Sequence, residues 1–367
     1  MTCRSPYVTS RTRYAVGVLV AGLLTMPSAA CTGNGAATTD SFTVGLLLPS
    51  RVVPRWETSD KPLIEQRVRQ LCPHCDITYA NADDDSTAQR QQMIAMITKG
   101  ARVIVLGATD NRALRSTVQE AHNAGVPVVA YDRLAEGPIS GYVTFDGIQV
   151  GTLQGQALLK AMHPPAKDGT IVMMNGDPTS PNAAWYKRGA LSVLRGKVRI
   201  GRSYDTHGWS TNNANANMSA AISALGPGGI DGVLAANDSM AAGVISALKS
   251  AHVRRLPPVT GQDADLDAVQ RVVNGEQSMT VYKSFRAEAE TAAAMAVALG
   301  RGEKLRTIAT TTTDSPTTHH IPSVLLTPVA VTTANIKQTL VKDGVYTVPQ
   351  ICTPQLRAAC AKAGLTP

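Results

Sequence analysis

The sequence predicts an α/β protein made of two similar lobes, each with a parallel sheet covered by helices. From residue 43 onward, short apolar runs rich in β-branched and aliphatic residues alternate with longer amphipathic stretches. Short runs of this kind are typical of strands buried on both faces. About four such units end near Phe145, and a fresh set begins after Gly151. Regular alternation of this type favours parallel sheets with right-handed crossovers.

The individual elements follow from the same pattern. The predicted strands are 43–48, 76–80, 102–108, 126–132, 170–176, 231–237, 257–263 and 278–283. The predicted helices between them include 87–100, 111–125, 240–251 and 285–300. Leu114, Val118 and Ala121 fall on one face at helical spacing. Gly100 and Gly125 stand where helices are expected to end.

Composition excludes some classes of protein. The chain has 367 residues, of which 44% are hydrophobic and 17% charged, and this leaves ample material for a core and two domains. The net charge is +8, and Arg4, Arg11 and Arg13 supply three of those charges, so +5 remains without them. The remaining basic residues form no dense run, so the sequence does not favour nucleic-acid binding.

The first 30 residues have the features of an export signal. The three arginines precede an apolar run at 15–24, which is too short to span a bilayer. Ser28, Ala29 and Ala30 then lead to Cys31, which resembles a bacterial lipobox with a lipid-anchored cysteine. Ser28 and Ala30 would also suit an ordinary leader peptidase, which would release a soluble protein. The small polar residues 32–40 predict a flexible tether.

Four further cysteines are an even number in an exported chain, which makes disulfides plausible. Proximity in sequence favours the pairs Cys72–Cys75 and Cys352–Cys360. Cys72 and Cys75 flank Pro-His, as in thiol oxidoreductases, but they follow a helical stretch and precede a strand. That order is the reverse of the one expected for the redox motif, so we interpret the pair as a local staple.

Polar side chains follow most of the predicted strands. Ligands of parallel α/β sheets lie beyond the carboxyl ends of the strands. The residues at those positions are Arg55, Trp56, Asp132, Arg133, 175–182, Asn237, Asp238, Gln262, Asp263 and Lys283. Amides, carboxylates and cations meet both the donor and the acceptor needs of a sugar hydroxyl. Trp56, Trp185 and Trp209 lie in or beside these loops, and we expect at least two of them to line the cleft.

Several segments carry a resemblance to a known family. They are Arg55-Trp56, 130–134, 145–158, 175–183, 207–209, 235–243, 261–269 and 279–283. In order and spacing they resemble periplasmic sugar-binding proteins of the type I periplasmic-binding-protein fold. The likeness is greatest to D-xylose-binding proteins and multiple-sugar receptors, and it extends over about residues 41–302.

The resemblance implies two Rossmann-like lobes with parallel sheets, joined by a three-segment hinge. It places residues 41–146 and about 284–320 in the first lobe, and 147–283 and about 321–350 in the second. Residues 351–367 then form a C-terminal tail, in which Cys352 and Cys360 are not features expected of the family.

The resemblance also implies site residues. Arg55, Asp132 and Arg133 should reach the ligand from the first lobe. From the second lobe and the hinge the implied contacts are Asn182, Asn237, Asp263 and Lys283, with Trp56 and Trp209 as stacking platforms. This chain departs from the pattern at Pro49, Ser50 and Ser180, where xylose binders tend to carry acidic residues. The identity of the sugar therefore stays open.

The implied protein is an exported lipoprotein, at the cell surface or in the periplasm, that binds a monosaccharide and delivers it to an ABC permease and its ATPase. We expect a monomer without cofactor, metal or enzymatic activity, held at the membrane through Cys31. A receptor that presents sugar to a membrane sensor kinase is an alternative that the sequence leaves open. A repressor of this fold would need a helix-turn-helix at the N-terminus, where the export signal stands.

Other chemistry is weakly supported. Asp132 and Asp263 resemble the carboxylate pair of a glycosidase, but in this fold each would sit beside a cation, Arg133 and Lys283 respectively, which would keep its pKa low. Residues 263–267 imitate the start of a calcium loop without its Gly and Glu. The adjacent His319 and His320 have no further ligands nearby, so we interpret them as surface residues. The acidic run 83–85 is expected to cap the helix that begins near Ser86.

Overall fold

The computed structural model describes residues 41–162 and 169–366. The predicted signal peptide, the lipid-anchor cysteine Cys31 and the tether all lie outside these residues. Within the described ranges, no helix has both the length and the apolar character that crossing a bilayer requires.

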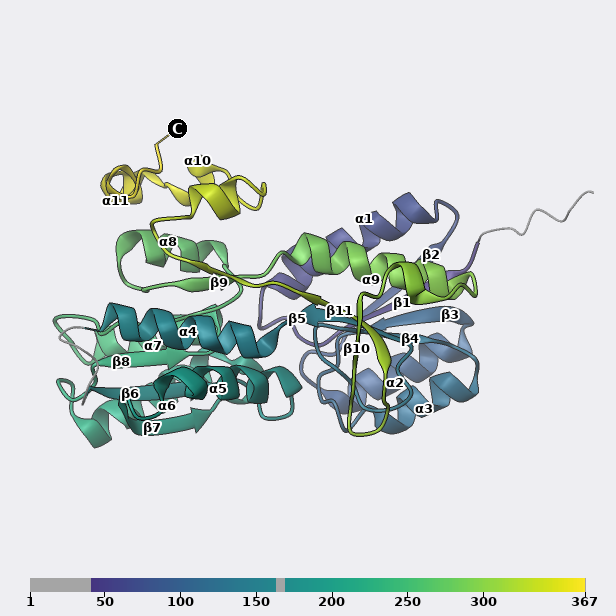
Figure 1. The fold of residues 1–367 in the computed structure, drawn as a ribbon, viewed down its shortest axis with the longest axis horizontal. Coiled ribbons are helices and arrows are strands. Elements are labelled where there is room, and N and C mark those ends of the chain that lie inside the picture. The colour runs from purple at the N-terminus through teal and green to yellow at the C-terminus, as the bar shows by residue number, and fades with distance from the viewer. Residues whose placement is uncertain (1–40, 163–168, 367) are drawn as a thin grey trace, which may run out of the picture. The chain divides into compact units, whose positions relative to one another are not determined.

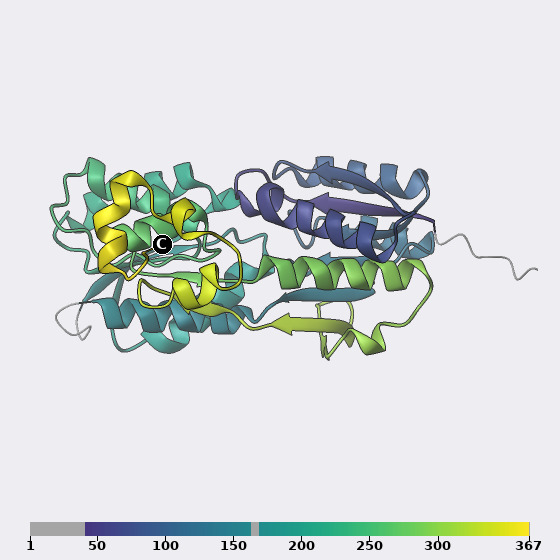
Figure 2. The same ribbon diagram turned by 90° about the horizontal axis from the view of Figure 1, so that it is seen from above.

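The first lobe is built on a seven-stranded sheet in the order β10-β11-β5-β4-β3-β1-β2. All neighbours are parallel except β10 and β11. Its elements are β1 (Thr43–Leu48), α1 (Lys61–Leu71), β2 (Asp76–Asn81), α2 (Ser86–Thr98), β3 (Ala101–Leu106), α3 (Arg115–Asn123), β4 (Val128–Tyr131), β5 (Gly141–Phe145), α9 (Phe285–Gly300), β10 (Thr311–Thr313) and β11 (Ile321–Leu326). Helices α1 and α9 run side by side on one face of the sheet, and α2 and α3 cover the other (Figures 1 and 2).

The local signals behave as the sequence predicts. Strand β1 is almost wholly buried, as a central parallel strand should be. The Asp85 side chain accepts hydrogen bonds from the backbone amides of Thr87 and Ala88 and so caps α2. Gly100 and Gly125 follow their helices with φ of 83° and 72°, a conformation that glycine adopts without a steric penalty.

The second lobe contains a parallel sheet in the order β7-β6-β8 and an antiparallel pair of β9 and β12. Its elements are α4 (Gly147–Ala161), β6 (Thr170–Asn175), α5 (Pro181–Leu194), β7 (Arg199–Asp205), α6 (Thr211–Leu225), β8 (Gly232–Ala235), α7 (Asp238–Ser250), α8 (Leu266–Asn274), β9 (Thr280–Tyr282) and β12 (Val329–Val331). Helices α4 and α5 pack together as one pair, and α6 and α7 as another. The predicted α/β architecture with mainly parallel sheets is confirmed.

The chain passes between the lobes three times: after β5, after β9 and after β11. The third passage differs from the sequence prediction, which places it near Ile321. Residues 323–326 of β11 pair in parallel with β5, so the chain leaves the first lobe only after Leu326. The reason is tertiary, because the β5 edge is open to a partner that the local sequence does not reveal.

One predicted strand is not formed, and one predicted helix begins later than expected. Residues 257–263 form a single bridge, between Val259 and Val233, and not a strand. The helix predicted from residue 111 begins at Arg115. The Asp110 side chain accepts hydrogen bonds from the backbone amides of Arg112 and Ala113, and these bonds hold a turn before the helix.

Residues 332–366 form a tail stapled by the disulfide Cys352–Cys360, with Cα atoms 5.9 Å apart. The tail contains α10 (Val348–Ile351) and α11 (Arg357–Lys362) and lies on the second lobe against α8 (Figures 1 and 2). Cys72 and Cys75 form a second disulfide just after α1.

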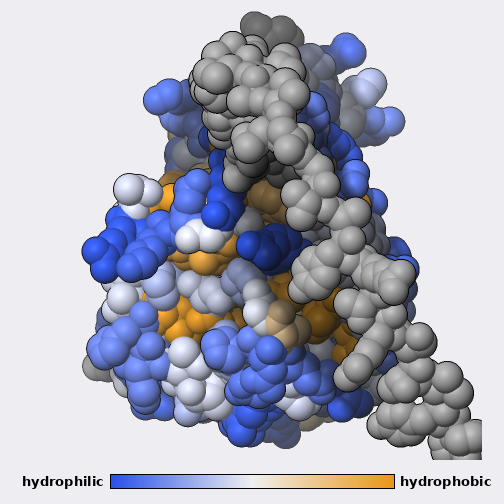
Figure 3. Space-filling view, turned by 90° about the vertical axis from the view of Figure 1, so that its right-hand side faces the viewer, coloured by the Kyte–Doolittle hydropathy of each residue, from blue (hydrophilic) through white to orange (hydrophobic). Residues whose placement is uncertain are grey.

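The face seen in Figure 3 is mainly hydrophilic, and its apolar side chains form separate patches among polar ones. The large apolar side chains that are exposed in the described residues are Val52, Ile94, Ile200, Leu325 and Val329. Scattered exposure of this kind is normal for a folded protein.

Helices α4 and α5 approach so closely that their contact requires glycine. A Cβ atom on Gly151 would lie 1.9 Å from the carbonyl oxygen of Tyr186 and 2.7 Å from the amide nitrogen of Ala190. Gly189, on the facing helix, meets the Ile148 carbonyl in the same way. The obstacle is backbone on both sides, so neither helix can yield by a rotamer change.

We therefore expect Gly151→Ala to lower the free energy of unfolding by about 1–3 kcal/mol through overpacking. Gly228→Ala is a matched control, since a Cβ there meets nothing within 4 Å. Urea unfolding followed by circular dichroism measures both. Equal midpoints for the two variants would contradict the close approach of α4 and α5.

Candidate functional site

A small cavity lies between the two lobes, and twelve side chains line it. They are Val53, Arg55, Trp56, Asp132, Arg133, Asn182, Tyr186, Trp209, Asn237, Gln262, Asp263 and Lys283. The enclosed space among them is only about 20 Å³. All nine side chains that the sequence predicts as ligand contacts are in this set; that they bind a ligand stays a prediction.

The topology of the sheets brings these residues together. Asp132 and Arg133 directly follow β4, Asn237 follows β8 and Lys283 follows β9. Carboxyl ends of parallel strands meet at one edge of a sheet, and here the two lobes direct those edges toward each other. Residues far apart in sequence thus share one cavity.

Arg55 is the centre of a buried ion cluster. Its guanidinium donates to Asp60 through Nε (2.7 Å) and Nη2 (2.8 Å), and Nη2 also donates to Glu288 at 2.7 Å. Its Nη1 donates to Asp132 Oδ2 at 2.9 Å. Since every nitrogen of the group has a carboxylate partner, we expect Arg55 to orient Asp132 more than to contact a ligand.

Lys283 joins the same cluster from the hinge. Its ammonium group lies 3.0 Å from Asp263 Oδ1 and 3.5 Å from Asp132 Oδ2, and its side chain is only 2% exposed. Asp132 also accepts a hydrogen bond from the Asn182 amide across the lobes at 2.7 Å. One carboxylate therefore links the first lobe, the hinge and the second lobe.

Charge partners decide the ionisation of these groups. Burial by itself would raise the pKa of Asp132, but Lys283, Arg55 and Arg133 outweigh it and hold that pKa well below its usual range. Burial would lower the pKa of Lys283, whereas Asp132 and Asp263 hold it above its usual range. Burial raises the pKa of Tyr186 to about 12, so its hydroxyl stays protonated.

Three lining residues have a left-handed backbone although none is glycine. The φ values are 59° for Asp132, 53° for Trp209 and 102° for Asp263. Such conformations cost about 1–3 kcal/mol each and persist where the surroundings hold them, often at functional sites. At Asp132 the carbonyl oxygen accepts from the hydroxyls of Tyr142 and Thr144, which fixes the turn.

Two of the three tryptophans line the cavity. The ring of Trp56 is contacted by the guanidinium of Arg55 at 4.5 Å and by that of Arg133 at 5.4 Å. Trp209 lies over Gly176, where a Cβ atom would be only 2.1 Å from its ring. Trp185 is elsewhere, packed against Gly147 beside a different pocket.

Four of the lining side chains keep a buried polar atom without a hydrogen-bond partner. Two are donors, the indole N–H groups of Trp56 and Trp209, and two are acceptors, Asn182 Oδ1 and Gln262 Oε1. Leaving such groups unpaired in the interior costs about 1–3 kcal/mol each. The cavity is therefore prepared for a ligand that both donates and accepts hydrogen bonds.

Some residues of the site were not predicted. Val53 and Tyr186 also line the cavity, and Asp60 and Glu288 anchor Arg55 from behind. Gln262 lines it too; the sequence places this residue after a predicted strand but not among the implied ligand contacts. A signal existed for Tyr186, which follows Asn182 by four residues and so shares its helix face. No local signal points to Glu288, because α9 meets Arg55 only after the chain has returned to the first lobe.

The positions that depart from the family pattern have other surroundings. Pro49, Ser50 and Ser180 do not line the cavity. The Ser50 hydroxyl donates to Asp84 at 2.6 Å, and the charge of Asp84 in turn acts on the buried Arg133. An acidic group thus remains near Arg133, but it comes from the turn after β2.

The rim of the cavity carries contacts between the lobes as well. Thr179 accepts the Asn111 amide through its carbonyl at 3.3 Å and donates its hydroxyl to the Thr109 carbonyl at 3.4 Å. Thr179 belongs to the loop after β6, whereas Thr109 and Asn111 follow β3. These long hydrogen bonds are weak, so the rim can open at little cost.

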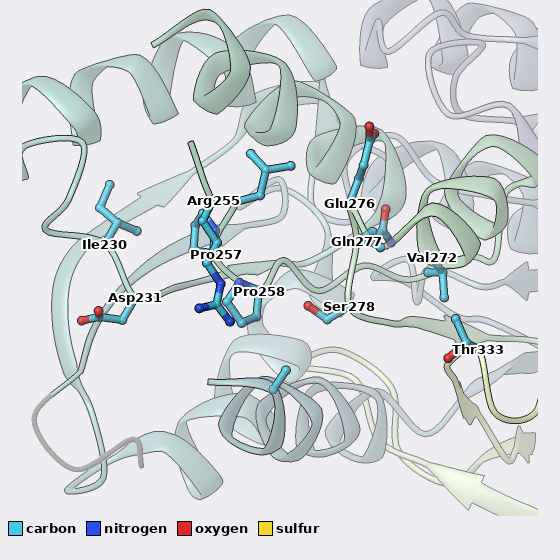
Figure 4. Close-up of a pocket in the computed structure, with 13 residues that line it drawn as sticks. Ile230, Asp231, Arg255, Pro257, Pro258, Val272, Glu276, Gln277, Ser278 and Thr333 are labelled. Atoms are coloured by element: carbon cyan, nitrogen blue, oxygen red, sulfur yellow. The ribbon is translucent and has the colours of Figure 1, made fainter. Parts of the chain in front are cut away.

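A larger hollow lies at the amino-terminal ends of the second-lobe strands (Figure 4). Three of its polar side chains already have partners: Asp231 accepts a hydrogen bond from the Thr170 amide, Glu276 pairs with Lys249, and Gln277 donates to Asp238. Ligands of such sheets bind at the carboxyl ends. We therefore assign the site to the interlobe cavity.

Within the described part of the chain, no group of three or more His, Cys, Asp or Glu side chains is arranged to hold a metal ion. His319 lies 3.4 Å from Asp314 on the surface.

The comparisons with known proteins all indicate the same family. A family model described as a periplasmic binding protein domain matches residues 44–304. The D-xylose-binding periplasmic protein of Escherichia coli is 33% identical over 330 residues, with 88% of this chain and 97% of that protein covered. The multiple sugar-binding periplasmic receptor of Rhizobium radiobacter is also 33% identical, with 85% and 93% covered.

Solved structures show the same likeness. An ABC transporter solute-binding protein from Clostridium phytofermentans, with bound β-D-glucose, has a TM-score of 0.77 and 29% identity. The aligned region covers 84% of this chain and 99% of the chain of that protein. A carbohydrate transporter solute-binding protein from Chloroflexus aurantiacus, in complex with D-glucose, has a TM-score of 0.76 and 26% identity, with 84% and 98% covered.

The ion cluster leads to a stability prediction. Arg55→Met leaves Asp60, Asp132 and Glu288 buried without their partner, so we expect the free energy of unfolding to fall by about 3–5 kcal/mol. Arg51→Met removes the partner of exposed Asp83 and should change little. Urea unfolding at pH 7 compares the two, and similar midpoints would show that the cluster around Arg55 is not a structural anchor.

Proposed function

This chain belongs to the periplasmic binding protein family, and from that premise we propose that it binds one monosaccharide, a xylose- or glucose-like aldopyranose, in the interlobe cavity. Membership of the family implies an exported protein that acts outside the cytoplasm. The finer assignment, to a sugar receptor that supplies an ABC importer, is supported by the chemistry of the cavity and by the relatives.

The observation that carries the proposal is the set of unpaired buried atoms. Trp56 and Trp209 offer donors, and Asn182 and Gln262 offer acceptors. A sugar hydroxyl is both donor and acceptor, and the C–H face of a pyranose ring packs on indole. The space enclosed between the lobes, about 20 Å³, is smaller than a pyranose, so the lobes must part to admit the sugar.

The carboxylates of the cavity favour binding over catalysis. Glycosidases need one carboxylic acid with a raised pKa beside a second carboxylate. Here the cationic partners Lys283 and Arg55 hold the pKa of Asp132 low, and Asp263 also pairs with Lys283. Carboxylates of this kind accept hydrogen bonds from hydroxyls and are poor general acids.

The mechanism we propose is hinge closure. Asp132 and Arg133 reach the ligand from the first lobe, while Asn182, Asn237 and Asp263 reach it from the second. Trp209 packs on the sugar ring, and a bound ligand joins residues from both lobes and so favours the closed form. The closed form then docks on a permease.

The experiment that tests this function is a titration of intrinsic tryptophan fluorescence, supported by calorimetry. The purified full chain is titrated with D-xylose, D-glucose, L-arabinose, D-galactose and D-ribose. We expect a saturable change with at least one sugar at micromolar concentration. The absence of a fluorescence change and of binding heat with all five sugars would refute monosaccharide binding.

A matched pair of variants then assigns the site. Asp263→Ala should weaken the affinity for the bound sugar tenfold or more, because it leaves hydroxyls of the ligand without a partner. Asp267→Ala, four residues further on and exposed, should bind like the wild type. Equal affinities of the two variants would remove Asp263 from the site.

We also propose that Cys31 is lipidated and holds the protein at the membrane. Cys31→Ser should then move the protein from the membrane fraction to the soluble fraction, with sugar affinity unchanged. Fractionation followed by immunoblotting measures the shift. A wild-type protein that is soluble from the start would instead support cleavage by an ordinary leader peptidase.

Delivery to an importer rests on the likeness to the Clostridium phytofermentans protein, which is a solute-binding protein of an ABC transporter. Uptake of the radiolabelled sugar by cells with and without this protein tests it. Loss of uptake in the deletion strain supports import, whereas normal uptake with a lost transcriptional response would support a sensor-kinase receptor.

A further inference from the structure

Asp263 stands on a turn that needs outside support. Asp263 and the next residue, Ala264, both have positive φ, 102° and 56°, and neither is glycine. Because each such conformation costs about 1–3 kcal/mol, the surroundings must hold the turn in place. The position of the Asp263 carboxylate in the cavity therefore depends on groups that need not touch a ligand.

The inner side of the turn is held by Asp238, a buried residue of the first turn of α7. The Ala264 amide donates to the Thr280 hydroxyl at 3.1 Å, and that hydroxyl donates to Asp238 at 2.9 Å. The Asp265 amide also donates to Asp238, at 3.0 Å. These hydrogen bonds fix the amide groups that follow Asp263.

The outer side is held by the C-terminal tail. The Tyr346 hydroxyl donates to the Ala264 carbonyl at 3.1 Å. Burial and the nearby charges of Asp265 and Asp238 raise the pKa of Tyr346, so the hydroxyl remains a donor throughout the physiological range. Tyr346 is the residue through which the tail bonds directly to the strained turn.

The tail is built to hold that position. It shares an apolar cluster with the turn and α8, made of Ala264, Val269, Val272, Val273, Tyr282, Val331, Ile336, Leu340, Ile351, Cys360 and Leu365. The disulfide Cys352–Cys360 closes the segment just after Tyr346. The family model ends at residue 304, so this support lies outside the matched domain.

We propose that the C-terminal tail is a positioning segment for the binding site, and that Tyr346 sets ligand affinity by fixing the turn that carries Asp263. The inference rests on the proposed function, because it assumes that Asp263 contacts the sugar. Tyr346 itself touches no ligand and acts only through the backbone.

Calorimetry with D-glucose and D-xylose tests the inference on the full chain. Tyr346→Phe keeps the ring and its packing and removes only the hydroxyl, so we expect affinity to fall about 3- to 10-fold, as for one lost hydrogen bond. In the Asp263→Ala background the same substitution should change affinity less than twofold, since the group being positioned is gone.

Thr347→Ala serves as the control. Thr347 caps α10 beside Tyr346 and does not bond to the turn, so Thr347→Ala should leave the turn in place and the sugar affinity within twofold of the wild type. Hydrogen exchange supplies a readout without sugar. The amides of residues 263–265 should exchange at least threefold faster in Tyr346→Phe than in Thr347→Ala.

Each outcome decides a different claim. Unchanged affinity in Tyr346→Phe, or equal losses with and without Asp263, would overturn the inference and leave sugar binding intact. A wild type that binds none of the five sugars tested above would instead overturn the proposed function and with it the premise of this inference. Unaltered exchange at residues 263–265 would show that Tyr346 does not hold the turn.

Discussion

The two lobes meet through buried ion pairs that centre on Asp132. Its carboxylate accepts a hydrogen bond from Arg55 of the same lobe and another from Asn182 of the facing lobe. It also forms an ion pair with Lys283 of the hinge. Burying charges is costly unless partners and hydrogen bonds compensate for lost water. The cluster meets that condition because each cation has at least two carboxylates within reach. The closed arrangement of the cavity depends on this compensation.

The same charges explain why the cavity suits ligand binding better than catalysis. The positive groups keep Asp132 in its acceptor form, which suits hydroxyl recognition and leaves this carboxylate no proton to transfer. The atoms that remain unpaired belong to neutral groups, the indole N–H of Trp56 and Trp209 and the amide oxygens of Asn182 and Gln262. A neutral polar ligand can satisfy them without disturbing the ion pairs, which is consistent with reversible capture and release.

Support for the cavity extends well beyond its lining. Gly176 leaves room for the ring of Trp209, Asp238 holds the turn after Gln262 from inside, and Tyr346 holds it from outside. Strained backbone at Asp132, Trp209 and Asp263 fits this picture, because such conformations persist only where several contacts agree. The tail, which lies outside the matched family domain, contributes to the same task.

Local sequence pattern by itself determined the α/β class, most strands and helices, and the residues that follow each strand. Hydrophobic period and helix caps act over a few residues, so Asp85 and Gly125 could be interpreted correctly without a fold. Tertiary structure alone decided that β11 joins the first sheet, that Asp60 and Glu288 hold Arg55, and that Trp185 lies away from the cavity. The pairing of β11 with β5 and the contact of Glu288 with Arg55 join segments far apart in the sequence, 233 residues apart in the second case. No local period encodes such contacts, because they are selected by the packing of the completed lobes.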